Sequence, residues 1–152
     1  MNYTPEQFTQ AVLKALETLN TPDVTKLSIQ ERKDLALNPN TPPEILTLLA
    51  QDKDWGVRCG VAENPNTPPK TLTILARDKV AYVRRYVAQN PNTPPESLEI
   101  LVQDKDWNVR QSAQQNPNYN PVKELKVTAK QYEALKKLLA ASKDEDLKSI
   151  QF

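Results

Sequence analysis

The 152-residue sequence has no histidine, only one cysteine and only two glycines. The absence of histidine removes His-based catalytic triads, imidazole general bases and every metal site that uses histidine. The single cysteine, Cys59, has no second cysteine in the chain with which to form a disulfide. Gly56 and Gly60 do not make a glycine-rich phosphate-binding loop. The sequence therefore predicts a protein that is not an enzyme and that uses no cofactor and no metal.

The chain also lacks a charge excess and a long apolar run. Its net charge is +1, so nothing global favours nucleic acid or an anionic membrane as a partner. No apolar stretch approaches the roughly 20 residues that span a bilayer. Residues 1–10 show no basic region followed by an apolar run, the pattern of a signal peptide. We therefore expect a monomeric, cytoplasmic protein that does not bind membranes.

Proline, in contrast, is abundant and recurs at a fixed spacing of 26 residues. The hexapeptide Asn-Pro-Asn-Thr-Pro-Pro stands at 38–43, 64–69 and 90–95, and a fourth copy opens at 116–118 before departing at Tyr119. A fixed period of this length indicates a solenoid of stacked repeats. We expect one repeat domain over 1–152, with an N-terminal cap and degenerate half-repeat at 1–37, repeats at 38–63, 64–89 and 90–115, and a C-terminal cap at 116–152.

The sequence of each repeat predicts two helices. In the first copy, Thr41 is the expected N-cap, Pro42 the first helical residue and Glu44 the second half of a Thr-x-x-Glu capping box. This helix is expected to run from 43 to about 51. A polar break then precedes a shorter second helix at about 55–63, which is either α-helical or partly 3₁₀. Neither helix buries its apolar stripe alone, so the repeats must stack.

Positions that are identical in all three copies are expected to serve folding. The hexapeptide makes the turn, with asparagine side chains bonding nearby backbone and proline fixing φ. An aspartate and an arginine also recur, and the favoured interpretation is a structural ladder in which guanidinium groups bond carboxylates or loop carbonyls. A ligand-binding arginine row is the alternative. The core set is Leu46, Leu72, Leu98, Leu49, Leu75, Leu101, Val57, Val83 and Val109, and the ladder set is Arg58, Arg84, Arg110, Asp52, Asp78 and Asp104.

Positions that differ between copies and face outward are the candidate binding residues. On the second helix these positions hold Gly56, Tyr82 and Asn108; Cys59, Arg85 and Gln111; Gly60, Tyr86 and Ser112; and Glu63, Gln89 and Gln115. Tyr82, Arg85 and Tyr86 are the first choices, because tyrosine and arginine are common binding anchors. Neutral drift on a solvated face is the alternative.

Two tryptophans add to this set. Trp55 and Trp107 occupy the same repeat position, with Ala81 between them, and would lie roughly 20 Å apart in a stack. The favoured interpretation is that they pack against the turn and the next repeat, and the alternative is that they flank a small groove floored by Ala81. The predicted partner-binding residues are therefore Tyr82, Arg85, Tyr86, Trp55, Trp107, Asn108 and Gln111.

Both ends of the chain carry helix signals. Thr4 with Gln7, and Ser28 with Glu31, predict helix N-termini. Residues 28–37 align with 54–63 and read as an eroded second helix. A C-terminal helix is expected from Thr128, with a short last helix from 142 to about 150.

The repeat resembles the leucine-rich repeat variant family over about residues 28–118. The resemblance rests on Asn-Pro-Asn-Thr-Pro-Pro-Glu-Ile-Leu-Thr-Leu-Leu-Ala-Gln-Asp, then Val57-Arg58 and Val61-Ala62 before the next Asn-Pro. It implies an all-α, right-handed α-solenoid with alternating α and 3₁₀ helices; HEAT-like repeats, with two full α-helices, are the near alternative. The founding type carries a cysteine-ligated iron–sulfur module, which needs about four cysteines. Cys59 alone does not supply it, and the family implies no general activity.

The leading functional hypothesis is a non-catalytic module that binds a protein or peptide on its concave face, by analogy with the architecture. The first alternative is a nucleic-acid-binding solenoid that uses the repeated Lys53, Lys79 and Lys105 beside the arginines. The matching aspartate row argues against it. The second alternative is a structural scaffold with no ligand of its own.

Overall fold

The computed structural model describes residues 4, 7, 10, 14, 23–121 and 129–141. The chain forms two compact units, residues 1–119 and 120–152, and each is described by itself. In the described part every regular element is a helix. The first unit contains η1 (Val24–Lys26), α2 (Ile29–Leu37), α3 (Pro43–Leu49), α4 (Trp55–Glu63), α5 (Pro69–Leu75), α6 (Ala81–Gln89), α7 (Pro95–Leu101) and α8 (Trp107–Gln114), and the second contains α10 (Ala129–Ala141).

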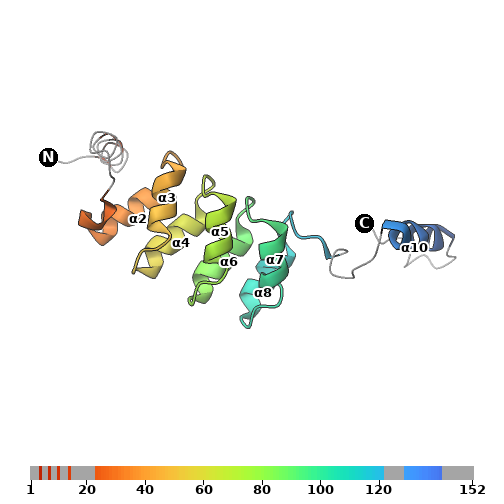
Figure 1. Ribbon diagram of the computed structural model, residues 1–152. Helices are drawn as coiled ribbons and strands as arrows, with labels where there is room; N and C mark the ends of the chain where they lie inside the picture. Colours follow the sequence, from red (N-terminus) through yellow and green to blue (C-terminus); the bar gives the residue numbers. More distant parts are fainter. Residues whose placement is uncertain are drawn as a thin grey trace. The chain divides into compact units, whose positions relative to one another are not determined.

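The first unit is an α-solenoid. Its helices follow one another side by side in chain order, from α2 to α8 (Figure 1). The second helices α4, α6 and α8 pack directly on one another and on α2, whereas successive first helices touch less. Each repeat therefore contributes one first helix, α3, α5 or α7, and one second helix to a continuous stack.

The second helix of each repeat is a full α-helix and is the longer of the two. The helix α4 has nine residues and α3 has seven, so the expectation that the second helix is the shorter one is wrong, whereas the α-helical alternative for its type is confirmed. Hydrogen bonds of the 3₁₀ type, between residues three apart, lie instead at the end of the first helix. There the Gln51 N–H donates to the carbonyl of Leu48, and the Asp52 N–H donates to the carbonyl of Leu49. These bonds close the first helix early, and the side chain of Asp54 then caps α4 by accepting from the Val57 N–H.

The predicted capping box at Thr41 is also wrong. Pro42 is the N-cap of α3, and its side chain makes no capping hydrogen bond. Thr41 is buried, and its hydroxyl donates to the carbonyl of Leu35, at the end of the preceding second helix, at 2.6 Å. The hydroxyl thus satisfies a C-terminal carbonyl across the turn and does not cap the next helix. Thr67 and Thr93 repeat the same bond to Val61 and Val87.

The predicted core is confirmed. The recurring leucines of the first helices and valines of the second helices are almost completely buried. Burying one such side chain contributes roughly 1.5–3 kcal/mol, so the stack supplies most of the stability of each short helix. These side chains are Leu46, Leu49, Leu72, Leu75, Leu98, Leu101, Val57, Val83 and Val109.

The N-terminal expectations are confirmed where the structure describes them. Ser28 and Glu31 form a reciprocal capping box at the start of α2. Thr4 and Gln7 exchange the same pair of bonds, each at 3.2 Å. The helix α2 packs on α4 as the eroded second helix that the alignment predicted. None of the described helices is long and apolar enough to cross a membrane.

The second unit contains the expected C-terminal helix, which begins at Ala129, one residue after the predicted start. Its Leu135 and Leu138 are exposed. The expected last helix at 142–150 and most of the expected first helix lie outside the described residues. The role of 116–152 as a cap remains a prediction.

Candidate interaction surface

Buried asparagines connect each repeat to the one before it. The side-chain amide of Asn90 donates to the carbonyls of Ala62 and Asn64 at 2.8 and 3.0 Å. Its carbonyl oxygen accepts from the Asn92 N–H at 2.9 Å. Asn64 and Asn116 make the same bonds in their own repeats. The sequence indicated only a local turn for these asparagines, and their recurrence every 26 residues was the signal for a ladder.

Arginines and aspartates form a second ladder beside the first. Arg58 holds Asp78 of the next repeat with two hydrogen bonds, Nε–Oδ2 at 2.6 Å and Nη2–Oδ1 at 3.1 Å. Its Nη1 donates to the carbonyl of Asp52 in its own loop at 2.7 Å. Arg84 holds Asp104 in the same way, and Arg32 of α2 holds Asp52. The ion pairs therefore run between repeats, and the loop carbonyls fix each guanidinium within its own repeat.

Burial and pairing together set the ionisation of the ladder. Burial by itself would raise the pKa of the Asp78 carboxyl, but hydrogen bonds from Arg58 and the Val80 N–H outweigh it, and the pKa lies below its ordinary value. The pKa of Asp104 is lowered for the same reasons, with Arg84 as its partner. The Asp78 carboxylate in turn raises the pKa of Arg58. Both members of the Arg58–Asp78 and Arg84–Asp104 pairs are therefore charged at neutral pH.

The ladder ends at Arg110. Its Nη1 donates to the carbonyls of Asp104 and Lys105 at 2.7 and 3.0 Å. Among the described residues no carboxylate pairs with it, and the position 26 residues after Asp104 is Lys130. The arginine row is thus held by structural contacts in all three repeats and offers little to a ligand.

Three large aromatic side chains of the candidate set are exposed. Trp55, Tyr82 and Trp107 are 52, 61 and 60% exposed, so the tryptophans are not packed into the turns. The rings of Trp55 and Tyr82 lie 6.0 Å apart between centroids, at a tilt of 33°. Arg85, Asn108 and Gln111 are exposed as well. These six residues all belong to the second helices α4, α6 and α8.

A small hollow lies within this surface, with a volume of about 140 Å³. Ala81 lines it, as the sequence predicted for the groove floor. Its other lining residues are Tyr82, Arg85, Asp106 and Asn108, so neither tryptophan lines it. The hollow therefore lies between α6 and the start of α8.

One varied position, and Cys59 at another, do not face outward as predicted. Tyr86 is half-buried and packs against the core, and Gly60 and Ser112 at the same repeat position are buried. This position faces the preceding second helix: a Cβ added at Gly60 would lie 2.9 Å from the Cβ of Ala36. Cys59 is buried too, which raises its pKa to about 11 and keeps the thiol protonated at neutral pH.

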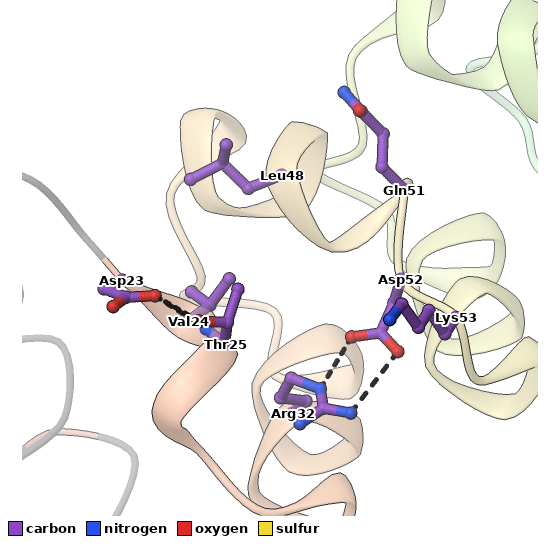
Figure 2. A pocket seen from close by; sticks show the side chains of 8 residues that line it. All are labelled: Asp23, Val24, Thr25, Arg32, Leu48, Gln51, Asp52 and Lys53. Carbon is purple, nitrogen blue, oxygen red and sulfur yellow. Dashed lines mark hydrogen bonds and ion pairs between the residues drawn. The ribbon is translucent and has the colours of Figure 1, made fainter.

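A larger hollow of about 430 Å³ lies at the N-terminal end of the stack, and no sequence signal pointed to it. Figure 2 shows Val24 and Leu48 on one side and the Arg32–Asp52 ion pair on the other. Because Arg32 is already neutralised by Asp52, the exposed Lys53 is the lining cation without an ion pair among the described residues.

The family model described as leucine rich repeat variant matches residues 55–79 and 82–106. The chain contains leucine rich repeat variant units. Each matched unit runs from a second helix to the loop after the following first helix, and so contains both partners of one ion pair, Arg58 with Asp78 or Arg84 with Asp104. No curated protein and no solved structure matches the chain.

The leucine rich repeat variant units here depart from the expected helix types, because both helices of each repeat are α-helical. Repeats of this kind form interaction or scaffold modules and are not a catalytic motif. The match names no specific partner.

Proposed function

We propose that this chain is a non-catalytic protein-interaction module that binds its partner across the exposed side of its second helices. The observation that carries this proposal is a contrast within the repeat. The leucine and valine positions of the core hold the same side chain in every copy, whereas most exposed positions of α4, α6 and α8 differ from copy to copy. A surface that is only solvated does not require large exposed aromatic side chains, so their presence here favours a binding surface.

The packing of the helices supports this choice of face. Because the second helices pack on one another more extensively than the first helices, we infer that they line the concave side of the stack. Trp55, Tyr82 and Arg85 lie on this side, and tryptophan, tyrosine and arginine are the residues that most often dominate binding energy.

The nucleic-acid alternative is weakened by the ladder. Arg58 and Arg84 are bound to carboxylates and loop carbonyls, and so are not available to phosphates. Lys53, Lys79 and Lys105 remain exposed. An electrophoretic mobility shift at low salt would favour nucleic acid, and the shift should disappear steeply as salt is raised.

The test is a quantitative affinity purification from the native host with two variants. The first replaces Trp55, Tyr82 and Arg85 with alanine on the second helices. The control replaces Leu48, Ile74 and Ile100 with alanine, which are exposed on the first helices. We expect partners to be lost with the first variant and retained with the control. Equal recovery from wild type and both variants would contradict the proposal and favour a scaffold.

A further inference from the structure

The three repeats differ sharply in charge. The middle repeat, 64–89, has five basic residues and one acidic residue, whereas each neighbouring repeat has two basic residues and four acidic ones. The charged residues of the middle repeat are Lys70, Arg77, Asp78, Lys79, Arg84 and Arg85. A cationic band one repeat wide therefore lies between two anionic bands.

The ion pairs between repeats do not neutralise the positive charge of this band. Asp78 is bound to Arg58 of the preceding repeat, and Arg84 to Asp104 of the following one. Lys70, Arg77, Lys79 and Arg85 are exposed and form no ion pair with the described residues. The loop before α6 carries Arg77 and Lys79, and α6 itself carries Arg85, which lines the small hollow.

The start of α6 lacks the carboxylates of its neighbours. Asp54 and Asp106 precede α4 and α8, whereas Val80 occupies the equivalent position before α6. The substitution removes a carboxylate from the middle of the exposed face and leaves one on either side, Asp106 without an ion pair among the described residues and Asp54 paired with Lys33 at 3.4 Å. The alternation of charge is therefore present on the candidate surface itself and not only in the composition of the repeats.

Aromatic side chains border the cationic band. Tyr82 lies one turn before Arg85 on α6 and contacts Trp55 of the preceding repeat. Trp107 is exposed at the start of α8 in the following repeat. A bound segment that places a carboxylate at Arg85 would therefore have apolar ring surface on which to pack its neighbouring side chains.

The width of the band limits the kind of ligand. Stacked helices lie about 10 Å apart, which corresponds to roughly three residues of an extended peptide. A nucleic acid would continue its negative charge over the two anionic repeats and be repelled there. A peptide can instead alternate in charge along its length.

We propose that the exposed face of α4, α6 and α8 binds an extended peptide segment with acidic residues at its centre and basic residues on both sides. The central carboxylate binds Arg85 at the small hollow, with Lys79 and Arg77 adding to the attraction. A flanking apolar side chain packs on Trp55 and Tyr82. This inference rests on the proposed function and names the partner's chemical class.

The test uses labelled peptides of about nine residues, enough to cross three repeats at about 3.3 Å per residue. One peptide has an acidic centre with basic flanks, a second has the charges reversed, and both carry the same apolar residue. We expect the first peptide to bind at least about tenfold more tightly by fluorescence anisotropy, with a preference that weakens as salt is added. Equal binding of the two peptides, or tighter binding of a nine-nucleotide single strand, would overturn the proposal.

Two variants with the same change in net charge distinguish the effect of the cationic band from the effect of net charge. Lys79→Glu with Arg85→Glu changes the middle repeat, and Lys53→Glu with Lys105→Glu changes the anionic repeats. Circular dichroism and urea unfolding verify that both variants fold. We expect the first variant to lose the acidic-centre peptide and to gain the charge-reversed one. We expect the second variant to retain the original preference, and the same behaviour from both variants would contradict the proposal.

Affinity purification with a Trp55→Ala, Tyr82→Ala variant beside the Lys79→Glu, Arg85→Glu variant separates this inference from the proposed function. If cellular partners depend on Trp55 and Tyr82 but not on Lys79 and Arg85, the interaction module stands and the acidic-peptide assignment fails. If no partner depends on either pair, both proposals fail.

Discussion

Polar side chains inside the stack determine how one repeat recognises the next. Each buried asparagine bonds two carbonyls 26 and 28 residues earlier in the chain, and each paired arginine bonds a carboxylate of the following repeat. Among the described residues, every buried side-chain nitrogen and oxygen has a hydrogen-bond partner. Because an unsatisfied buried group is costly, these bonds favour one register of stacking over its neighbours.

Replacing Asn90 with alanine tests the asparagine ladder. The carbonyls of Ala62 and Asn64 would lose their donor, and the Asn92 N–H would lose its acceptor. We expect the free energy of unfolding to fall by about 3 kcal/mol, as measured by urea denaturation. The control is Asn40→Ala, at an exposed position whose side chain bonds none of the described residues, with an expected change within about 0.5 kcal/mol. Similar small losses in both variants would refute the role of the ladder.

The pH dependence of stability tests the ion pairs. The pKa of Asp78 is lower in the folded chain than the roughly 3.9 of an unfolded aspartate. Its stabilising contribution is therefore complete above about pH 4 and is lost as pH falls through the folded pKa. We expect urea unfolding to show this loss on acidification, with Asp104 contributing in the same direction.

Asp78→Asn removes one carboxylate from this titration. It leaves Arg58 buried without its counter-charge, and we expect a loss of about 3 kcal/mol at neutral pH. The difference from wild type should shrink as the pH is lowered, because wild-type Asp78 is then protonated too. Glu44→Gln, at an exposed glutamate, serves as the control and should change stability by less than about 0.5 kcal/mol. A constant difference across the acidic range would contradict the assignment.

At the scale of helices, close approach between second helices decides which side chains are tolerated. A Cβ at Gly60 would lie 2.9 Å from the fixed Cβ of Ala36 on α2. A Cβ at Gly56 would instead meet the ends of the Lys33 and Asp54 side chains at 2.7 and 2.9 Å. Lys33 can move aside, and at the equivalent position of α8 Asp106 caps the helix although Asn108 has a Cβ. The two glycines of α4 therefore have different roles although they lie one turn apart.

Alanine at each glycine should change stability in opposite directions. Gly56→Ala should stabilise the chain by up to about 1 kcal/mol, because alanine favours the helix. Gly60→Ala should destabilise it by about 1 kcal/mol net, because the clash with α2 exceeds the same helical gain. Urea denaturation of the two variants provides the comparison, and stabilisation by both would show that α2 and α4 have room to separate.

At the scale of the whole solenoid, stability is a sum over neighbouring repeats. Deleting residues 64–89 removes one complete period and joins Glu63 to Asn90. Asp104 then takes the place of Asp78 opposite Arg58, so the ladders remain in register. We expect a folded helical chain with an unfolding m-value lower by about a quarter and with reduced stability.

A deletion of half the length provides the control for this prediction. Removing residues 64–76 joins a second helix to another second helix and separates the ladder partners, so we expect the stack to lose its cooperative unfolding by circular dichroism. The full-repeat deletion should also lose the acidic-centre peptide, because it lacks Arg85 and Lys79. Equal loss of structure in the two deletions would contradict the modular description.

Much of the fold could be predicted from the sequence, because the signals for it are local. The hexapeptide marks each turn from a second helix to the next first helix, the capping box at Ser28 starts α2, and the predicted bounds of α4 match those observed. The exposed tryptophans and Tyr82 also follow from the disagreement between copies. The position shared by Gly60 and Tyr86 was misplaced, because its orientation depends on how closely successive second helices approach.

The amino-acid sequence by itself determines the repeat period, the helices and the apolar core of this protein, because turn and helix preferences act over a few residues. The partners of the polar side chains depend on stacking. Arg58 and Asp78 are 20 residues apart, and Asn90 and Ala62 are 28. Thr41 shows the consequence: its hydroxyl had a plausible local role as a cap, but the folded chain offered it the buried carbonyl of Leu35. The bond formed on folding prevailed over the local preference for a helix cap, because a buried polar group without a hydrogen bond costs more free energy.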